Sequence, residues 1–307
     1  MSPRSRAGAV ILLLTLVALG LEAKGQAVEV AFEPAHQLTG GQFEYTVKRG
    51  DSLRILGTRY GVPVSVLARD NHLPLDTKLE PGMTIRIDNR HIPPAEMERG
   101  ILINVPQRML FFFETGKASG YPVAVGKPSW QTRLGSFKVV RLARNPTWIV
   151  PESIQLEMEE NGEEVLTEVP PGPDNPLGRH AIYLSIPGYL VHGTNAPLSI
   201  YSARTHGCIR LNPADIEALY PRVKVGDTGE IVYRPAMLAV LSDGRIFVEV
   251  NRDIYHRAAD PVLIIRRQAE VANASARMDW KAVAAAASKA EGIAREVELA
   301  GPPANAP

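Results

Sequence analysis

A single cysteine marks the most informative stretch of this chain. Cys208 is the only cysteine among 307 residues, and it directly follows His206 and Gly207, with a second histidine, His192, a short loop upstream. An exported chain with one cysteine cannot close an internal disulfide. Cys208 is therefore a free thiol, an intermolecular link or a nucleophile.

The neighbouring residues favour the nucleophile. Only a thiolate attacks, and a free cysteine with a pKa of roughly 8.5 is mostly protonated at neutral pH, so it needs an adjacent base. We expect His192 to end a strand and loop 193–204 to fold back, bringing Cys208 beside the imidazole. The carbonyl of Gly193 can fix the imidazole tautomer. The tight turn at Gly207 places backbone N–H groups near the sulfur, where an oxyanion could be held.

Two other roles for Cys208 stay open. Free cysteines are often buried and inert, packing as small hydrophobes. His192, His206 and Cys208 could together bind zinc, although their spacing matches no common zinc arrangement. We expect no metal and no cofactor at this site.

The elements that must position these residues are mainly short strands. Between about residues 99 and 234, apolar runs alternate with Gly and Pro, which indicates a sandwich or barrel. One helix is expected at 213–220, with Asn212 as its N-cap and Pro213 in its first position. The expected strands are 101–105, 109–113, 119–125, 135–140, 181–184, 189–192 and 229–233.

The start of the chain predicts export. Residues 1–27 form a signal peptide, with Arg4 and Arg6 before the apolar run 10–19 and a small-x-small cleavage site ending at Ala27. Cleavage after Ala23 and a retained anchor are alternatives. The formal charge of +1 gives no strong attraction to nucleic acid, and no glycine-rich phosphate loop is present. We expect a periplasmic protein without a nucleic-acid partner.

A small module at 43–88 has the pattern strand, helix, helix, strand. It closely resembles the LysM domain through the runs 45–53, 59–62 and 79–85 together with Leu67 and Asn71. The resemblance implies a groove for N-acetylglucosamine-containing glycans. It assigns glycan contact to Gly50, Asp51, Ser52 and Leu53 on one side and to Asn71, His72 and Leu73 on the other. Turn and cap chemistry accounts for these residues equally well.

The C-terminal region, 235–300, predicts a hairpin and a helix. Runs 238–241 and 245–250 flank an Asp-Gly turn, which favours a tight hairpin. From Pro261 to about Glu298 the sequence is Ala-rich, and we expect one helix that lies on the preceding domain. Its apolar face would contain Val271, Met278, Ala282, Ala286, Ile293 and Val297. Residues 301–307 should be a disordered tail.

The central domain, 99–234, resembles the L,D-transpeptidase catalytic domain. The resemblance rests on the runs 190–195 and 205–211, and it extends to 121–126, 145–148 and 169–178. It implies a mainly β, sandwich-type catalytic fold with a small α+β LysM domain before it. A signal peptide, LysM and this domain in that order are a familiar layout for periplasmic members.

The family implies a mechanism. Cys208 would attack the diaminopimelate carbonyl of a peptidoglycan tetrapeptide stem, expel D-alanine and pass the acyl group from a thioester to an amine. By position, His192 matches the general base and Gly193 the carbonyl that orients it. Gly207 and Cys208 supply oxyanion N–H groups, and His206 shapes the site. Substrate contacts are assigned to Arg210, Thr205 and Asn195. A guanidinium suits a carboxylate, although Arg210 could equally form a structural ion pair.

Three functions compete. The first is an L,D-transpeptidase whose acceptor is a second stem or a lysine of an outer-membrane lipoprotein. The second is a hydrolase that uses the same thioester with water, cutting wall peptides or detaching a lipoprotein. The third is a non-catalytic glycan-binding protein; the complete set of His192, His206 and Cys208 argues against it. Peptidoglycan is the expected partner in each case.

Overall fold

The computed structural model describes residues 33–257 and 259–299. The expected signal peptide and C-terminal tail lie outside this part of the chain. Within the described residues, none of the helices combines the length and apolar character needed to cross a bilayer. The fold is mainly β, as the sequence predicts, and the described residues form six α-helices.

The N-terminal module has the expected βααβ order. The Ser52 hydroxyl caps the first helix by accepting from Ile55 N, and Gly61 ends it in a left-handed conformation, with φ of 70°. The two strands pair antiparallel, with Tyr45 opposite Ile85. The elements are β1 (Gln42–Thr46), α1 (Leu53–Tyr60), α2 (Val64–Asp70) and β2 (Thr84–Asp88).

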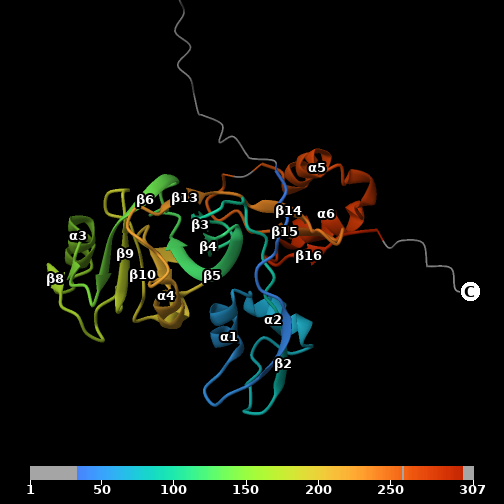
Figure 1. Ribbon diagram of the computed structural model, residues 1–307. Coiled ribbons are helices and arrows are strands. Elements are labelled where there is room, and N and C mark those ends of the chain that lie inside the picture. Colours follow the sequence, from blue (N-terminus) through green and yellow to red (C-terminus); the bar gives the residue numbers. More distant parts are fainter. Residues whose placement is uncertain (1–32, 258, 300–307) are drawn as a thin grey trace, which may run out of the picture. The chain divides into compact units, whose positions relative to one another are not determined.

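The central domain is built on one long sheet (Figure 1). Its strand order is β11-β5-β12-β10-β9-β6-β13-β3-β4. The strands are β3 (Gly100–Asn104), β4 (Met109–Glu114), β5 (Lys117–Gly126), β6 (Gly135–Arg144), β9 (His180–Leu184), β10 (Leu190–His192), β11 (Ala203–Thr205), β12 (Ile209–Leu211) and β13 (Thr228–Val232). Helix α4 (Pro213–Leu219) follows β12, with Asn212 as its side-chain N-cap.

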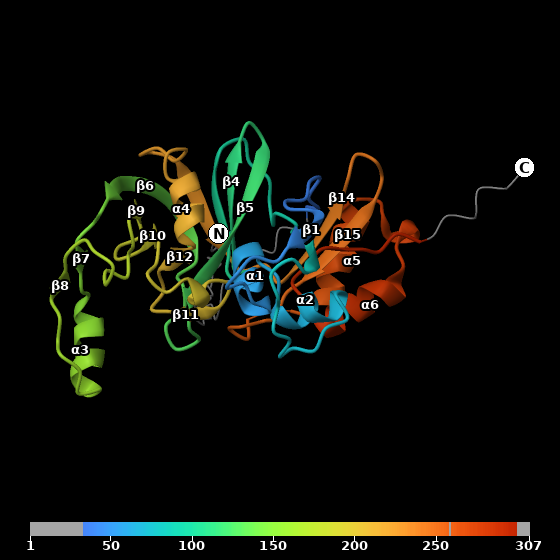
Figure 2. The ribbon, with the colours of Figure 1, turned by 90° about the horizontal axis from the view of Figure 1, so that it is seen from below.

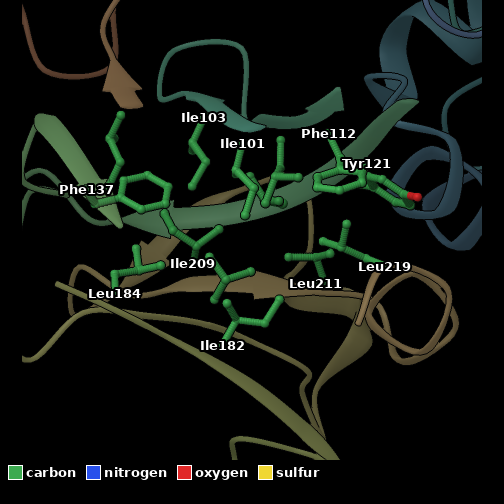
Figure 3. Close-up of a cluster of buried hydrophobic side chains, with 14 of the residues drawn as sticks. Ile101, Ile103, Phe112, Tyr121, Phe137, Ile182, Leu184, Ile209, Leu211 and Leu219 are labelled. Carbon is green, nitrogen blue, oxygen red and sulfur yellow. The ribbon is translucent and has the colours of Figure 1, made fainter. Parts of the chain in front are cut away.

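Strand β5 joins the two ends of this sheet. Its first part, through Pro122, pairs with β4, and Val123 and Ala124 pair with β12. The sheet therefore folds back on itself, and two layers of strands face one apolar core. Figure 3 shows the side chains between the layers, with Ile101, Ile103 and Phe112 on one side and Ile182, Leu184, Ile209 and Leu211 on the other. The core fixes which face of β9, β10 and β12 remains for the site.

A segment between β6 and β9 contains elements that the sequence analysis did not anticipate. Strands β7 (Trp148–Ile149) and β8 (Glu168–Val169) pair antiparallel, and helix α3 (Glu152–Glu160) connects them. Both views show α3 beside β8 (Figures 1 and 2). No residue of α3 is buried, and Leu156 is 54% exposed. The helix therefore has weak apolar support, and its polar contacts with the site become important.

The C-terminal region forms the expected hairpin, but the expected single helix is divided. Strands β14 (Ala236–Val240) and β15 (Ile246–Val250) pair antiparallel. Asn273, with φ of 52°, interrupts the helical pattern, and Asp279 caps a new helix. Val271 is 56% exposed, so the predicted apolar face was wrong at that position. The later elements are α5 (Pro261–Val271), α6 (Trp280–Lys289) and β16 (Arg295–Glu296). The 3-10 turns are η1 (Pro197–Ser199) and η2 (Ser275–Arg277).

Candidate active site

Side-chain alternation on three adjacent strands defines one face of the sheet. Ile209 and Leu211 of β12 point into the core, so Cys208 and Arg210 lie on the opposite face. On β10, Val191 is in the core, and His192 therefore shares the face of Arg210. The parallel register pairs His192 with Arg210 directly. The fold thus brings the predicted nucleophile, base and carboxylate anchor onto one surface.

The turn before Cys208 is held by buried hydroxyl groups. Thr132, which is 1% exposed, donates to the carbonyl of Gly207 at 2.9 Å and accepts from Gly126 N at 2.8 Å. Gly207 has φ of 109°, and a Cβ there would lie 3.0 Å from the Tyr189 hydroxyl. Only glycine fits this position, because both the conformation and the space exclude a side chain.

One of the two backbone N–H groups assigned to the oxyanion, that of Gly207, already donates a hydrogen bond to the Thr205 side chain. The Thr205 hydroxyl donates to the carbonyl of Cys208 at 2.6 Å and accepts from Gly207 N at 3.1 Å. Thr205 is 1% exposed, so its hydroxyl serves the turn in this structure. A substrate oxyanion at Gly207 would have to compete with that bond.

The His192 imidazole is buried and electrically neutral. Burial, with a smaller contribution from the Arg210 charge, lowers the pKa of His192 to about 3. The backbone of Gly193, Pro176 and Leu177 lies near the ring and acts in the opposite direction. Nδ1 nevertheless has no hydrogen-bond partner at bonding geometry among the described residues. The expected orienting role of Gly193 therefore stays a proposal.

The Cys208 thiol is also neutral. Burial raises the pKa of Cys208 above its ordinary value, while the nearby Leu190 backbone and the Arg210 charge partly oppose this. Its Sγ donates weakly to the carbonyl of Gly188 at 3.6 Å. The half-buried Cys208 thiol and the buried His192 imidazole line the same cavity, and their surroundings disfavour the charged form of each.

A cavity of about 740 Å³ opens over this face. Trp148 of β7 and Tyr183 of β9 line it, and Pro151 and Ile154 come from the segment around α3. Cys208, His192, Thr205, His206 and Arg210 also line the cavity. This volume suits an extended peptide rather than a small ion.

His206 is tied to α3 rather than to Cys208. Its Nε2 pairs with the Glu157 carboxylate, which also accepts from Lys127 Nζ at 3.0 Å. The edge of the Trp130 ring meets the imidazole, with centroids 4.5 Å apart. The Lys127 and His206 contacts lower the pKa of Glu157. His206 thus joins the nucleophile turn to the helix at the rim of the cavity.

Arg210 and Asn195, two of the residues assigned to substrate contact, lie in different cavities. Arg210 lines the cavity, makes no ion pair within the described residues, and has a buried Nε without a partner. Burial lowers its pKa. Asn195 instead lines a separate cavity, where its amide donates to the carbonyl of Asp174 at 3.1 Å. Arg210 therefore remains available for a ligand, whereas Asn195 does not face Cys208's cavity.

The residues assigned to glycan binding largely support the module's own fold. The Asp51 carboxylate accepts from the Tyr45 hydroxyl at 2.6 Å and from Lys48 N at 2.9 Å. Leu53 is buried in the module core. The Asn71 amide donates to the carbonyls of Leu67 and Arg86 and accepts from Arg86 N. Ser52 caps α1, and Gly50 and His72 occupy turns with positive φ, with the His72 side chain exposed. Glycan contact by these residues stays a proposal.

Sequence reasoning missed Glu157, Thr132 and Arg141, all of which support or line the site. Glu157 lies in a polar run with no motif, and its partner His206 is 49 residues away in sequence. Thr132 lies in the loop between β5 and β6, and Arg141 lies within β6; no sequence motif marks either residue, and only the tertiary structure reveals their roles. Among the described residues, no cluster of three or more His, Cys, Asp or Glu side chains could hold a metal.

The fold and site describe a two-part class of protein, in which a LysM module precedes an L,D-transpeptidase catalytic domain. The family profile described as the L,D-transpeptidase catalytic domain matches residues 98–232, and the LysM domain profile matches residues 45–88.

Known relatives extend this likeness over most of the chain. It is 30% identical over 250 residues to "Probable L,D-transpeptidase YcfS" of Escherichia coli K12, covering 80% of this chain and 78% of that protein. It is 31% identical over 212 residues to "Probable L,D-transpeptidase ErfK/SrfK" of Salmonella typhimurium LT2, covering 68% of each. The identity to "Probable L,D-transpeptidase YbiS" of E. coli K12 is 30% over 224 residues, covering 71% and 72%. The chain belongs to the L,D-transpeptidase family.

Proposed function

We propose that this protein is a periplasmic cysteine acyltransferase that remodels peptidoglycan through an L,D-transpeptidase reaction. The observation that carries the proposal is the shared sheet face on which Cys208, His192 and Arg210 line one cavity. Family membership supports the transpeptidase activity and the LysM domain supports peptidoglycan as the substrate.

The first half-reaction starts from the neutral pair. As Cys208 Sγ attacks the diaminopimelate carbonyl carbon, the thiol proton passes to the His192 imidazole. The carbonyl oxygen becomes an oxyanion, held by the N–H groups of Cys208 and Gly207 once Thr205 yields the latter. Collapse breaks the bond to D-alanine, whose amine takes the proton from His192. A thioester and free D-alanine result.

The second half-reaction runs the same steps with an amine. The acceptor amine attacks the thioester, His192 receives its proton, and Cys208 leaves as the protonated thiol. The product is an amide between two stems, or between a stem and a lysine of an outer-membrane lipoprotein. Burial keeps the His192 imidazole neutral and able to accept a proton, but its low pKa makes it a weak base, so proton transfer must accompany the attack rather than precede it.

The test uses purified protein with a disaccharide-tetrapeptide. We expect D-alanine release and an acyl-enzyme mass on Cys208, both abolished by Cys208→Ser. Adding a tetrapeptide or a lysine-ended peptide as acceptor identifies the amine by mass spectrometry of the product. Release of a tripeptide without any acceptor product would instead establish the hydrolase. Full activity of the serine variant would exclude the thioester mechanism.

A further inference from the structure

Arg141 lines the same cavity as Cys208, and its guanidinium stacks on an aromatic ring. It lies on β6 directly across from Tyr183 of β9, and its guanidinium carbon is 3.6 Å from the centroid of the Tyr183 ring. This is stacking distance. A guanidinium stacked on a ring keeps the N–H groups in its own plane free for a second, planar partner, and a carboxylate matches that fork.

The cavity has positive charge without a matching negative charge. Arg141, Arg144 and Arg210 line it, and no aspartate or glutamate is among its lining residues. Within residues 33–257 and 259–299, none of the three arginines forms an ion pair. Glu157, which lines the adjoining cavity, is already paired with Lys127 and His206. Other arginines of the fold do pair with acids, namely Arg59, Arg69, Arg90, Arg99, Arg222, Arg245, Arg277 and Arg295.

The sheet register sets how far Arg141 lies from the nucleophile. Arg141 is opposite Tyr183, Tyr183 is opposite Leu190, and Cys208 comes one position before the pair of Val191 with Ile209. Three strand spacings of about 4.8 Å therefore separate the backbones of Arg141 and Cys208 by about 14 Å. The guanidinium rests on the Tyr183 ring, one strand nearer to Cys208 than its own backbone. About two strand spacings, roughly 10 Å, therefore separate it from the Cys208 backbone.

The donor of the proposed reaction has a carboxylate that can bridge this separation. In diaminopimelate, six bonds join the attacked carbonyl carbon to the carboxyl carbon at the far end of the side chain, a span of roughly 7 Å when extended. A hydrogen bond of about 3 Å to the guanidinium completes the distance. We propose, resting on the proposed function, that Arg141, stacked on Tyr183, binds this free side-chain carboxylate and selects stems that carry it over stems in which it is a carboxamide. Arg210 then remains for a carboxylate nearer the scissile bond.

Amidation would harm binding in two ways. A carboxamide loses the charge-assisted, two-point contact with Arg141. It also leaves the amine at the same carbon as an uncompensated cation in a cavity lined by arginines. We therefore expect wild-type protein to favour the free-carboxylate donor by about 10- to 100-fold in kcat/KM, mainly through KM.

The experiment compares two synthetic tetrapeptide donors, identical except for a free or amidated diaminopimelate side chain. D-alanine release is measured for wild type, Arg141→Gln, Arg141→Lys and Arg144→Gln. We expect Arg141→Gln to reduce the preference to about threefold or less and Arg141→Lys to be intermediate, because lysine keeps the charge but lacks the planar fork. Arg144→Gln removes the same charge from the same strand and should change both donors alike, leaving the preference intact.

Binding of both donors to Cys208→Ala by calorimetry gives a second readout that needs no turnover. Wild-type D-alanine release without a preference, or a preference that survives Arg141→Gln, would overturn the carboxylate subsite while leaving the proposed function standing. No release from either donor by wild-type protein would overturn both.

Discussion

Two buried histidines of this protein show opposite relations to their surroundings. His91 is 1% exposed, and both its ring nitrogens face acceptors, Glu249 Oε1 at 3.1 Å and the Gly61 carbonyl at 3.1 Å. His192 is 3% exposed, yet its Nδ1 has no partner at bonding geometry among the described residues. Burial is therefore common to both, and only the state of the hydrogen bonds separates a structural histidine from the candidate base.

The hydrogen bonds around His91 form a buried network that links several parts of the fold. Glu249 of β15 is fully buried and also accepts from Ile92 N at 2.7 Å, from the Gln107 amide at 2.9 Å and from the Asn251 amide at 3.2 Å. Gly61 ends α1 of the LysM module, and Gln107 follows β3. One carboxylate thus connects the interdomain segment, the catalytic domain and the C-terminal hairpin, with its polar atoms satisfied.

The difference teaches where a buried polar group is useful for chemistry. A fully satisfied network stabilises one arrangement, because every donor has a fixed acceptor. An unsatisfied buried imidazole lowers the stability of the folded protein, because its ring nitrogen loses hydrogen bonds to water and gains no partner in return. Burial also disfavours its charged form. In the proposed mechanism, the proton of the Cys208 thiol supplies a partner for the His192 ring. Experiments on each histidine and its hydrogen-bond partners test this contrast.

The largest expected effect is on catalysis at His192. His192→Ala should lower D-alanine release by about 10³-fold or more, because proton transfer from Cys208 loses its acceptor. His91→Ala should leave turnover per folded molecule within about threefold of wild type. Rates are measured at saturating donor, with folded protein quantified by circular dichroism. Equal losses in the two variants would show that the two histidines do not differ in role.

The next effect is on stability at Glu249. Glu249→Ala should lower the free energy of unfolding by about 3–5 kcal/mol, since it leaves buried donors of His91, Ile92 and Gln107 without an acceptor. Urea unfolding followed by circular dichroism measures this change. Asp243→Ala, which removes an exposed carboxylate from the same hairpin, is the control and should leave the free energy of unfolding almost unchanged. If Glu249→Ala changes the free energy of unfolding as little as the control does, the proposed stabilising role of this hydrogen-bond network is wrong.

The smallest effect concerns how Cys208 responds to pH. Because burial raises the thiol pKa and lowers that of His192 to about 3, protonation of His192 does not alter the thiolate fraction between pH 5 and 8. Alkylation of Cys208 by iodoacetamide should rise about tenfold per pH unit over this range. Intact mass measured against time gives the rate at each pH. A plateau reached near neutral pH would instead reveal a preformed thiolate–imidazolium pair.

The sequence by itself determined much about the chemistry and the fold. The run from Thr205 to Arg210 and the position of His192 identified the candidate nucleophile and base, because each residue type has few roles in such a pattern. Short apolar runs broken by Gly and Pro predicted the strands around the core, and the LysM elements followed from turn and cap residues such as Ser52 and Gly61. The Asp-Gly turn predicted the hairpin of β14 and β15.

Only the tertiary structure decided which groups meet. The break near Asn273 divided a helix that periodicity alone extended, because a periodic apolar pattern does not record a single positive φ. Asn195 faces a separate cavity, although its sequence neighbours include His192. The pairing of Glu157 with His206 and the stacking of Arg141 on Tyr183 depend on strand order and register. Those are set by packing of the whole sheet around its core, which no local stretch of sequence specifies.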